Sequence, residues 1–370
     1  MSANTKAILI IKTAALGDVL RTTAILPGLA AQHPGARIVW VTAASAVDLV
    51  RTHPLVSEVV AIDTRSSASV DTVRERLLPT RWTRVISLDD EEPLCALASA
   101  LQADELNGAF MRKDGQRAYT SDVAPWFDMG LLSVHGKAAA DRLKIVNQKS
   151  QPQIYAEMLG IGVGKPELHL PRAAIEFADA FAERTQLANN GPVIGLNTGA
   201  GGRWVSKQLS VERTIDLAGS LARDLAGRVT FVVFGGESES ARNRAILAGM
   251  ALDPRKPRAI DAGTENTLFE FAALVARCDL LITSDSLALH MAIAQGVQVV
   301  SFFAPTSAAE IELYGQGEKV VSTASDYCSY KPDADNSSIT VERLLEAVLR
   351  QLDAARIRRQ SSSAARATRG

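Results

Sequence analysis

Four segments of this sequence carry charged or hydroxyl side chains where a strand is followed by a helix, and three of them also contain glycine. The first is Lys12-Thr13-Ala14-Ala15-Leu16-Gly17-Asp18. Gly17 permits a tight turn, and Asp18 falls at the helix start, where it can cap backbone N–H groups or accept a proton from a substrate hydroxyl. The spacing leaves both roles open. The segment lacks the Gly-x-Gly-x-x-Gly order of dinucleotide-binding turns and the Gly-Lys-Ser/Thr of a P-loop.

The second segment, residues 197–207, is a candidate cradle for a diphosphate. It follows a predicted strand with the sequence Asn-Thr-Gly-Ala-Gly-Gly-Arg-Trp-Val-Ser-Lys. Its small residues let backbone N–H groups approach an anion, and Arg203 and Lys207 add positive charge. A flexible glycine-rich loop with solvent-facing charges would have the same composition, so the pattern alone does not choose between the two.

The third segment, residues 283–290, carries a hydroxyl and an imidazole at a helix start. Ser286 and His290 are four residues apart and share one face of the first helical turn. A hydroxyl, an imidazole and the helix N-terminus together favour an anion. A capping serine followed by a packed histidine is the alternative.

Acidic side chains define the remaining candidates. Residues 234–239 (Phe-Gly-Gly-Glu-Ser-Glu) place a carboxylate at a helix start, where it can hold a ribose diol or complement the helix dipole. Asp89-Asp90-Glu91-Glu92 and Asp333-Ala334-Asp335 are candidate metal ligands. No histidine is near either acidic run, and short acidic runs are usually solvated, so we expect no functional metal.

These segments need a parallel α/β scaffold, and short β-branched runs do alternate with helical periods. We predict strands at residues 7–12, 37–42, 58–62, 84–88, 193–197, 229–234, 280–284 and 297–303. We predict helices at residues 18–31, 211–225 (capped by Ser210), 239–250 and 268–277, and a short one ending at residue 295. Residues 109–150 are expected to form loops and short helices, and residues 164–172 an extended connector. Ligands of such folds bind at the carboxyl ends of strands.

The composition agrees with two domains. The chain has 370 residues, of which 47% are apolar, and 40 basic residues balance 41 acidic ones. This length and apolar content permit two cores, and the charge balance argues against a nucleic-acid binder. Cys95, Cys278 and Cys328 form neither a disulfide framework nor a zinc spacing, which is typical of a reducing compartment. We expect neither a signal peptide nor a membrane span.

Taken together, these segments resemble glycosyltransferase family 9, the ADP-heptose:lipopolysaccharide heptosyltransferases. Residues 12–20 are similar to the opening Lys-x-x-x-x-Gly-Asp-x-Leu of the family, and five further stretches follow its landmarks in order: residues 53–56, 85–89, 197–207, 234–239 and 285–290. Pro305-Thr306 matches the end of its Phe-Gly-Pro-Thr. Leu287 and Ala304 stand where the family usually has the glycines of Asp-Thr-Gly and Phe-Gly-Pro-Thr.

The resemblance implies a GT-B fold, with two facing Rossmann-like doubly wound domains. We expect an acceptor-binding domain at residues 1–170 and a donor-binding domain at residues 171–353. The arginine-rich residues 354–370 are predicted to be disordered.

The resemblance also implies an inverting, metal-independent transfer of a sugar, heptose by family default, from an ADP-linked nucleotide sugar. In that reading Asp18 is the base, and Lys207 and Arg203 neutralise the leaving diphosphate. The donor site is completed by Thr198, Gly199, Gly201, Glu239 (on ribose), Asp285, Ser286 and His290. The acceptor-side loop contains Lys12, Thr13 and Gly17.

The expected partners are therefore a nucleotide-sugar donor and a saccharide or lipid-linked saccharide acceptor. We expect no nucleic acid and no other cofactor, and a cytoplasmic location that allows peripheral contact with the inner membrane. Two alternatives keep the fold and change the function. One is a nucleotide-sugar epimerase or hydrolase, and the other is a nucleotide-sugar-binding relative without catalysis.

Overall fold

The computed structural model describes residues 6–201 and 204–367, with side chains described as far as Ala354. The chain divides into two compact units. The first comprises Met1–His169 with Ala309–Glu312, and the second comprises Leu170–Ala308 with Leu313–Gly370. The division after His169 falls within the connector expected at residues 164–172, of which residues 164–171 have no helix or strand and Arg172 begins a helix.

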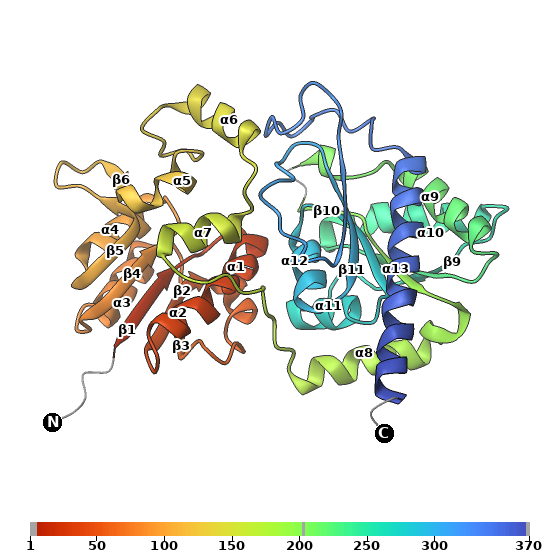
Figure 1. Cartoon of the computed structure of the whole chain (residues 1–370), viewed down its shortest axis with the longest axis horizontal. Helices are drawn as coiled ribbons and strands as arrows, with labels where there is room; N and C mark the ends of the chain where they lie inside the picture. The colour runs from red at the N-terminus through yellow and green to blue at the C-terminus, as the bar shows by residue number, and fades with distance from the viewer. Residues whose placement is uncertain (1–5, 202–203, 368–370) are drawn as a thin grey trace. The chain divides into compact units, whose positions relative to one another are not determined.

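The first unit is built on a six-stranded sheet in the order β3-β2-β1-β4-β5-β6 (Figure 1). Strands β1 to β5 pair in parallel, and β6 is antiparallel to β5. The strands are β1 Ala7–Ile11, β2 Arg37–Ala43, β3 Glu58–Ile62, β4 Trp82–Ser87, β5 Ala103–Met111 and β6 Arg117–Tyr119. The helices are α1 Leu16–Thr22, η1 Thr23–Ile25, α2 Leu26–Gln32, η2 Ala44–Leu49, α3 Ser67–Leu77, α4 Glu92–Ala100, η3 Ser121–Val123, α5 Ala124–Phe127, α6 Lys137–Val146 and α7 Gln151–Leu159.

The second unit has a six-stranded, fully parallel sheet in the order β12-β11-β10-β7-β8-β9. The strands are β7 Val193–Asn197, β8 Thr230–Phe234, β9 Arg258–Asp261, β10 Leu280–Ser284, β11 Gln298–Phe303 and β12 Gly317–Val321. The helices are α8 Arg172–Arg184, η4 Leu187–Asn190, η5 Val205–Lys207, α9 Val211–Asp224, η6 Glu237–Glu239, α10 Ser240–Leu252, α11 Leu268–Val275, α12 Leu287–Ala294 and α13 Val341–Ala367.

Each sheet lies inside its own apolar core. Every residue of β1, β8 and β10 is buried, as expected for parallel strands covered on both faces. In the first unit, Leu9, Val39 and Val85 belong to one core cluster. In the second, Phe231 and Leu280 pack with residues of α9 and α13. The two doubly wound sheets predicted from the sequence are therefore confirmed.

The single helix predicted at residues 18–31 is wrong, because the segment breaks into α1, η1 and α2. Pro27 sits in the first turn of α2, where its missing N–H costs nothing. Asp18 is not the N-cap of α1. That position belongs to Ala15, and Asp18 lies three residues further on, with its Oδ2 accepting from the Ala15 N–H at 3.3 Å. Gly17 lies in the first turn of α1.

Two other segments are more regular than expected. Strand β5 covers residues 103–111, partly within the region predicted as loops and short helices. Helix α13 continues to Ala367, so residues 354–367 are helical instead of irregular. Alanine and arginine, which dominate that tail, are strong helix formers.

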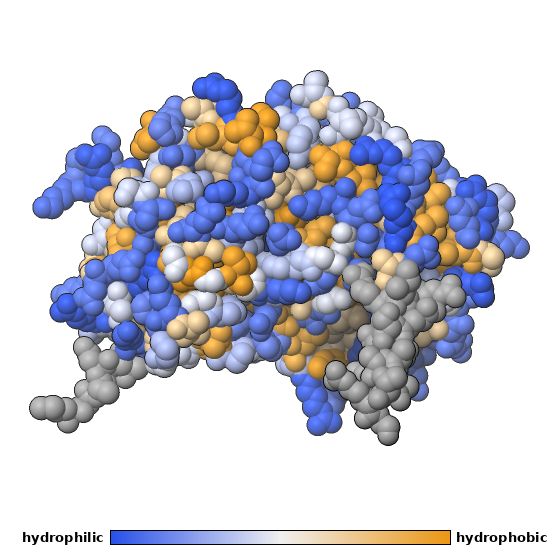
Figure 2. Space-filling model, viewed as in Figure 1, coloured by the Kyte–Doolittle hydropathy of each residue, from blue (hydrophilic) through white to orange (hydrophobic). Residues whose placement is uncertain are grey.

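Exposed apolar side chains gather on α6 and on the loop before it. Leu131 and Val134 in the loop and Ile145 and Val146 on the helix are all exposed. In Figure 2, orange surface lies where Figure 1 places α6. Among the described residues, no helix has both the length and the apolarity needed to cross a membrane.

Candidate active site

Strand order places one candidate site in the second unit. The chain builds β7, β8 and β9 toward one edge of the sheet and then returns to place β10 on the other side of β7. Such a switch point leaves a crevice at the carboxyl ends of the two central strands, where α/β proteins bind ligands. Asn197 ends β7, and Asp285 directly follows β10, so both predicted segments meet here.

An ion pair occupies this switch point. Lys207 Nζ lies 2.9 Å from Asp285 Oδ2 and donates to the Asp285 carbonyl oxygen at 2.7 Å. The Thr306 hydroxyl donates to the same carboxylate at 2.8 Å, and His290 Nε2 lies 4.0 Å from Asp285 Oδ1. Both members of the pair are mostly buried, with 11% and 17% of their side chains exposed. Lys207 also lies over the Trp204 ring, 5.7 Å from its centroid.

Hydroxyl groups line the adjoining strand ends. Asn197 Nδ2 donates to Thr283 Oγ1 at 3.0 Å and to Ser286 Oγ at 3.3 Å, and these hydroxyls are 3.0 Å apart. Ser286 is the N-cap of α12, so the predicted helix start is confirmed, but its side chain bonds to this cluster instead of capping. The donors and hydroxyls therefore surround the N-terminus of a helix, a setting that suits an anion.

The loop at residues 198–201 packs against the carboxylate of Glu239. Thr198 Oγ1 lies 3.0 Å from the Phe234 carbonyl oxygen and donates to the side chain of Asn243. A Cβ on Gly199 would lie 2.2 Å from Glu239 Cδ, so only glycine fits there. Glu239 is 4% exposed, and its two oxygens accept from Gly236 N and Ser238 Oγ, both at 2.9 Å. In this structure the carboxylate therefore braces its own loop.

One more predicted donor residue, Gly201, lies in this loop. Gly201 has φ of +77°, a conformation that favours glycine. Arg203 falls outside the described residues.

In the first unit, the predicted acceptor-side loop lies at the equivalent switch point, between β1 and β4. Lys12, which follows β1, forms an ion pair with Asp89, which follows β4, and both side chains are about nine-tenths buried, with 9% and 10% exposed. The Thr13 hydroxyl donates to Asp89 at 2.7 Å, and its backbone N–H also donates there. Burial alone would lower the pKa of Lys12. The carboxylates of Asp89 and Asp18 raise it by more, so the net pKa lies above its usual range. These contacts fix the loop.

Asp18 is the more accessible carboxylate of this loop. Its side chain is 37% exposed, and Oδ1 lies 2.8 Å from an Arg21 guanidinium nitrogen. Arg21 lies over the Trp126 ring, 5.8 Å from its centroid, and Trp126 contacts Tyr155 edge to face. Burial raises the pKa of the Tyr155 phenol to about 12, so it stays neutral. The arrangement holds one carboxylate at the surface beside a fixed cation.

Sequence reasoning missed several of these partners. Arg21 is three residues after Asp18, and Asn243 is four residues after Glu239. These helical spacings are the signal that could have found both residues. Asp89 was noted only as a metal candidate and a landmark, although its carboxylate anchors Lys12 and Thr13. Asp335, from the second acidic run considered for a metal, accepts from the Ser337 N–H at 2.7 Å.

Comparison with known proteins decides the family. The sequence model described as glycosyltransferase family 9 (heptosyltransferase) matches residues 143–339, more than half of the chain. The chain belongs to glycosyltransferase family 9. The matched range contains the Lys207–Asp285 pair and the hydroxyl cluster, whereas the loop at residues 12–18 precedes it. Curated proteins gave no match.

Solved structures support the same fold. A family 9 glycosyl transferase from Veillonella parvula is 21% identical, with a TM-score of 0.76, and the match covers 95% of this chain and 98% of that one. E. coli ADP-heptose LPS heptosyltransferase II is 18% identical with a TM-score of 0.62, covering 96% and 99%. E. coli heptosyltransferase WaaC with ADP is 17% identical with a TM-score of 0.58, covering 93% and 98%.

These matches confirm three predictions from the sequence. The first is the family, which is heptosyltransferase-like glycosyltransferase family 9. The second is the GT-B fold with two Rossmann-like units, and the third is that the protein is a glycosyltransferase. The roles of individual residues remain predictions.

Proposed function

We propose that this family 9 glycosyltransferase transfers a sugar from a nucleotide-sugar donor to a saccharide or lipid-linked saccharide acceptor, with inversion and without a metal. The main support for a donor site is the buried Lys207 ammonium at the switch point of the second unit, within the residues that match the family model. An ammonium beside hydroxyls and a helix start can neutralise a diphosphate leaving group. ADP-heptose is the donor expected by family default, and WaaC has been solved with ADP.

Lys207 is paired in the described structure, so binding a diphosphate requires a change of partner. In the proposal the ammonium turns from the Asp285 carboxylate to the phosphate oxygens, and Thr306 keeps its hydrogen bond to Asp285. Ser286 and the α12 N-terminus then complete the anion site, and Glu239 exchanges one of its contacts to Gly236 or Ser238 for a ribose hydroxyl. Arg203 is the second proposed phosphate contact.

On the acceptor side, Asp18 acts as the base. Its carboxylate takes the proton from an acceptor hydroxyl, whose oxygen attacks the anomeric carbon. The bond from that carbon to the diphosphate oxygen breaks, and the diphosphate leaves with the electron pair. Attack opposite the leaving group inverts the anomeric centre. Arg21 orients Asp18 through the 2.8 Å ion pair, and Lys12 and Thr13 keep the loop in place.

A product assay tests this chemistry. Wild-type protein, ADP-heptose and a saccharide acceptor are incubated in EDTA, and ADP release and product anomer are measured. We expect acceptor-dependent release and an inverted product, with Asp18→Asn slower by about 10²- to 10⁴-fold. Release that does not depend on the acceptor would favour a hydrolase, and loss of activity in EDTA would contradict metal independence.

A further inference from the structure

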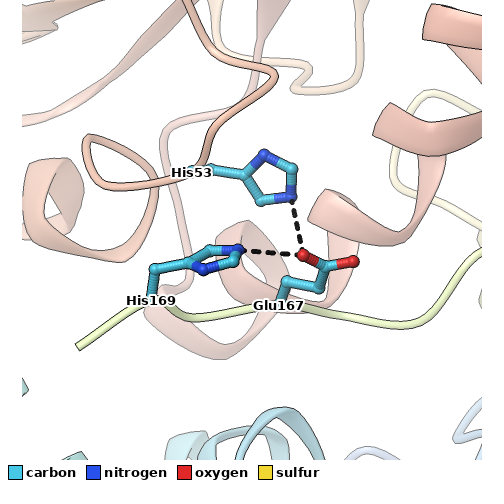
Figure 3. A group of neighbouring side chains, drawn as sticks. All are labelled: His53, Glu167 and His169. Atoms are coloured by element: carbon cyan, nitrogen blue, oxygen red, sulfur yellow. Dashed lines mark hydrogen bonds and ion pairs between the residues drawn. The ribbon is translucent and has the colours of Figure 1, made fainter.

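Three side chains capable of binding a metal converge in the first unit, away from the residues assigned above (Figure 3). His53 comes from the loop after η2, and Glu167 and His169 come from the extended segment that precedes Leu170. Their ligand atoms all lie within 4.8 Å of one another. Glu167 Oε2 is 2.9 Å from His169 Nε2 and 3.8 Å from His53 Nε2.

The imidazole of His53 supplies the second observation. The residue is only 3% exposed, and its Nε2 points at Glu167 (Figure 3). Within the described residues, Nε2 has no hydrogen-bond partner, whereas Nδ1 accepts from the Leu55 N–H at 3.2 Å. A buried ring nitrogen without a partner is unfavourable. The cluster is therefore incomplete as a purely hydrogen-bonded group.

Local structure preorganises the other two ligands. Glu167 and His169 are two residues apart in the chain, and their side chains already meet, with Oε2 and Nε2 2.9 Å apart. The segment is held to the first unit, because the Glu167 N–H donates to Thr23 Oγ1 and the Gly164 N–H donates to the Ala24 carbonyl oxygen, both at 3.0 Å. Both ligand side chains remain about half exposed, so water and ions can reach them.

We propose that His53, Glu167 and His169 form a zinc site, with both Nε2 atoms and one Glu167 oxygen as ligands and water in the fourth position. Zinc bonds of about 2.0–2.2 Å in a tetrahedron place ligand atoms roughly 3.3–3.5 Å apart. The observed 2.9 and 3.8 Å bracket that spacing. Two imidazoles with one carboxylate suit zinc better than calcium or magnesium, which prefer oxygen ligands alone.

Binding has one local cost. A neutral His53 that accepts at Nδ1 carries its proton on Nε2, so the proton moves to Nδ1 when zinc takes Nε2. The long hydrogen bond from Leu55 is then lost, and the zinc bond replaces it. The bound ion would join the loop at His53 to the last residues of the first unit and stiffen the connector. The proposed transfer reaction does not depend on this site.

Zinc titration of the full chain tests the proposal. The protein is freed of any purification tag, stripped with EDTA and dialysed, and zinc chloride is titrated by calorimetry. We expect one zinc ion per chain and a higher Tm with zinc. Cobalt(II) in the same site should show the absorption of a tetrahedral ion.

The variant His169→Ala is the decisive test, because the half-exposed His169 side chain can be removed without opening the core. It should weaken zinc binding by roughly ten-fold or more and abolish the rise in Tm, and Glu167→Gln should do the same. The matched control is His135→Ala, which removes an exposed histidine that pairs with Asp128 at 3.4 Å. Failure of the stripped wild type to bind zinc, or equal affinity in wild type and His169→Ala, would overturn the proposal.

Discussion

Replacing Lys207 by methionine keeps the apolar stem and removes the charge that pairs with Asp285. At 2.9 Å the pair has a gross attraction of about 6 kcal/mol at an effective dielectric constant of about 20. Breaking a buried pair from one side usually costs 3–5 kcal/mol, because the other charge stays buried. Thr306 still donates to Asp285 in the variant, so we expect the low end, about 3 kcal/mol.

Urea denaturation measures this loss, but the two units can unfold separately, so the probe must report the second one. Trp204 is the single tryptophan of that unit, and its fluorine NMR signal in 5-fluorotryptophan protein provides the probe. The double variant Lys207→Met/Asp285→Asn should recover much of the loss, because no buried charge remains.

The control is Arg172→Met, which breaks a pair with Glu176 in the same unit. Its N–O distance is 2.6 Å, but the two side chains are 91% and 59% exposed. Exposed pairs of this spacing contribute about 0.3–0.5 kcal/mol. If Lys207→Met destabilises the second unit no more than Arg172→Met, the inference that this pair is buried and coupled is refuted.

Three further outcomes are expected. A Cβ on Gly199 would lie 2.2 Å from Glu239 Cδ, so Gly199→Ala should cost about 1–3 kcal/mol in urea denaturation, and an unchanged stability would show that Glu239 moves freely. Hydrogen bonds from Arg255 hold the pKa of Asp253 below its ordinary value, so this carboxylate stabilises the fold above about pH 4 and the contribution is lost as the pH falls through the folded-state pKa. In acid denaturation the wild type should therefore lose more stability than Asp253→Asn, and parallel curves would contradict this. Burial raises the pKa of the Cys95 thiol to about 11, so Ellman's reagent at about pH 8 should label it only after unfolding; rapid labelling of the native protein would disagree.

The sheets could be predicted because their signal is local. Buried parallel strands such as β1 and β8 are continuous apolar runs, and turn residues bound them. Strand β5 was not predicted because its first residues, Ala-Asp-Glu, are partly exposed and include two acidic side chains, so they do not form an apolar run. Pro27 is a sequence signal for the break in the helix at residues 18–31. The apolar periodicity continues across Pro27, however, and it predicted one continuous helix.

The site was only partly predictable, because its contacts are long-range. Lys12 meets Asp89 across 77 positions, and Lys207 meets Asp285 across 78. Because each of these residues follows a predicted strand, the sequence places it at the carboxyl end of a sheet. Only the strand order, which the sequence does not give, brings β1 next to β4 and β7 next to β10. The histidine cluster is harder still, since His53 and Glu167 have no shared periodicity or motif.

The central claim is that Lys207 holds the nucleotide and Asp18 does not. Its most direct test is calorimetric titration of ADP, UDP and GDP in EDTA into wild type, Lys207→Met and Asp18→Asn, each first shown to be folded. We predict that the wild type binds one nucleotide, with ADP preferred, that Lys207→Met binds it at least about ten-fold more weakly, and that Asp18→Asn keeps its affinity. Binding of no nucleotide, or equal binding by wild type and Lys207→Met, would contradict the account.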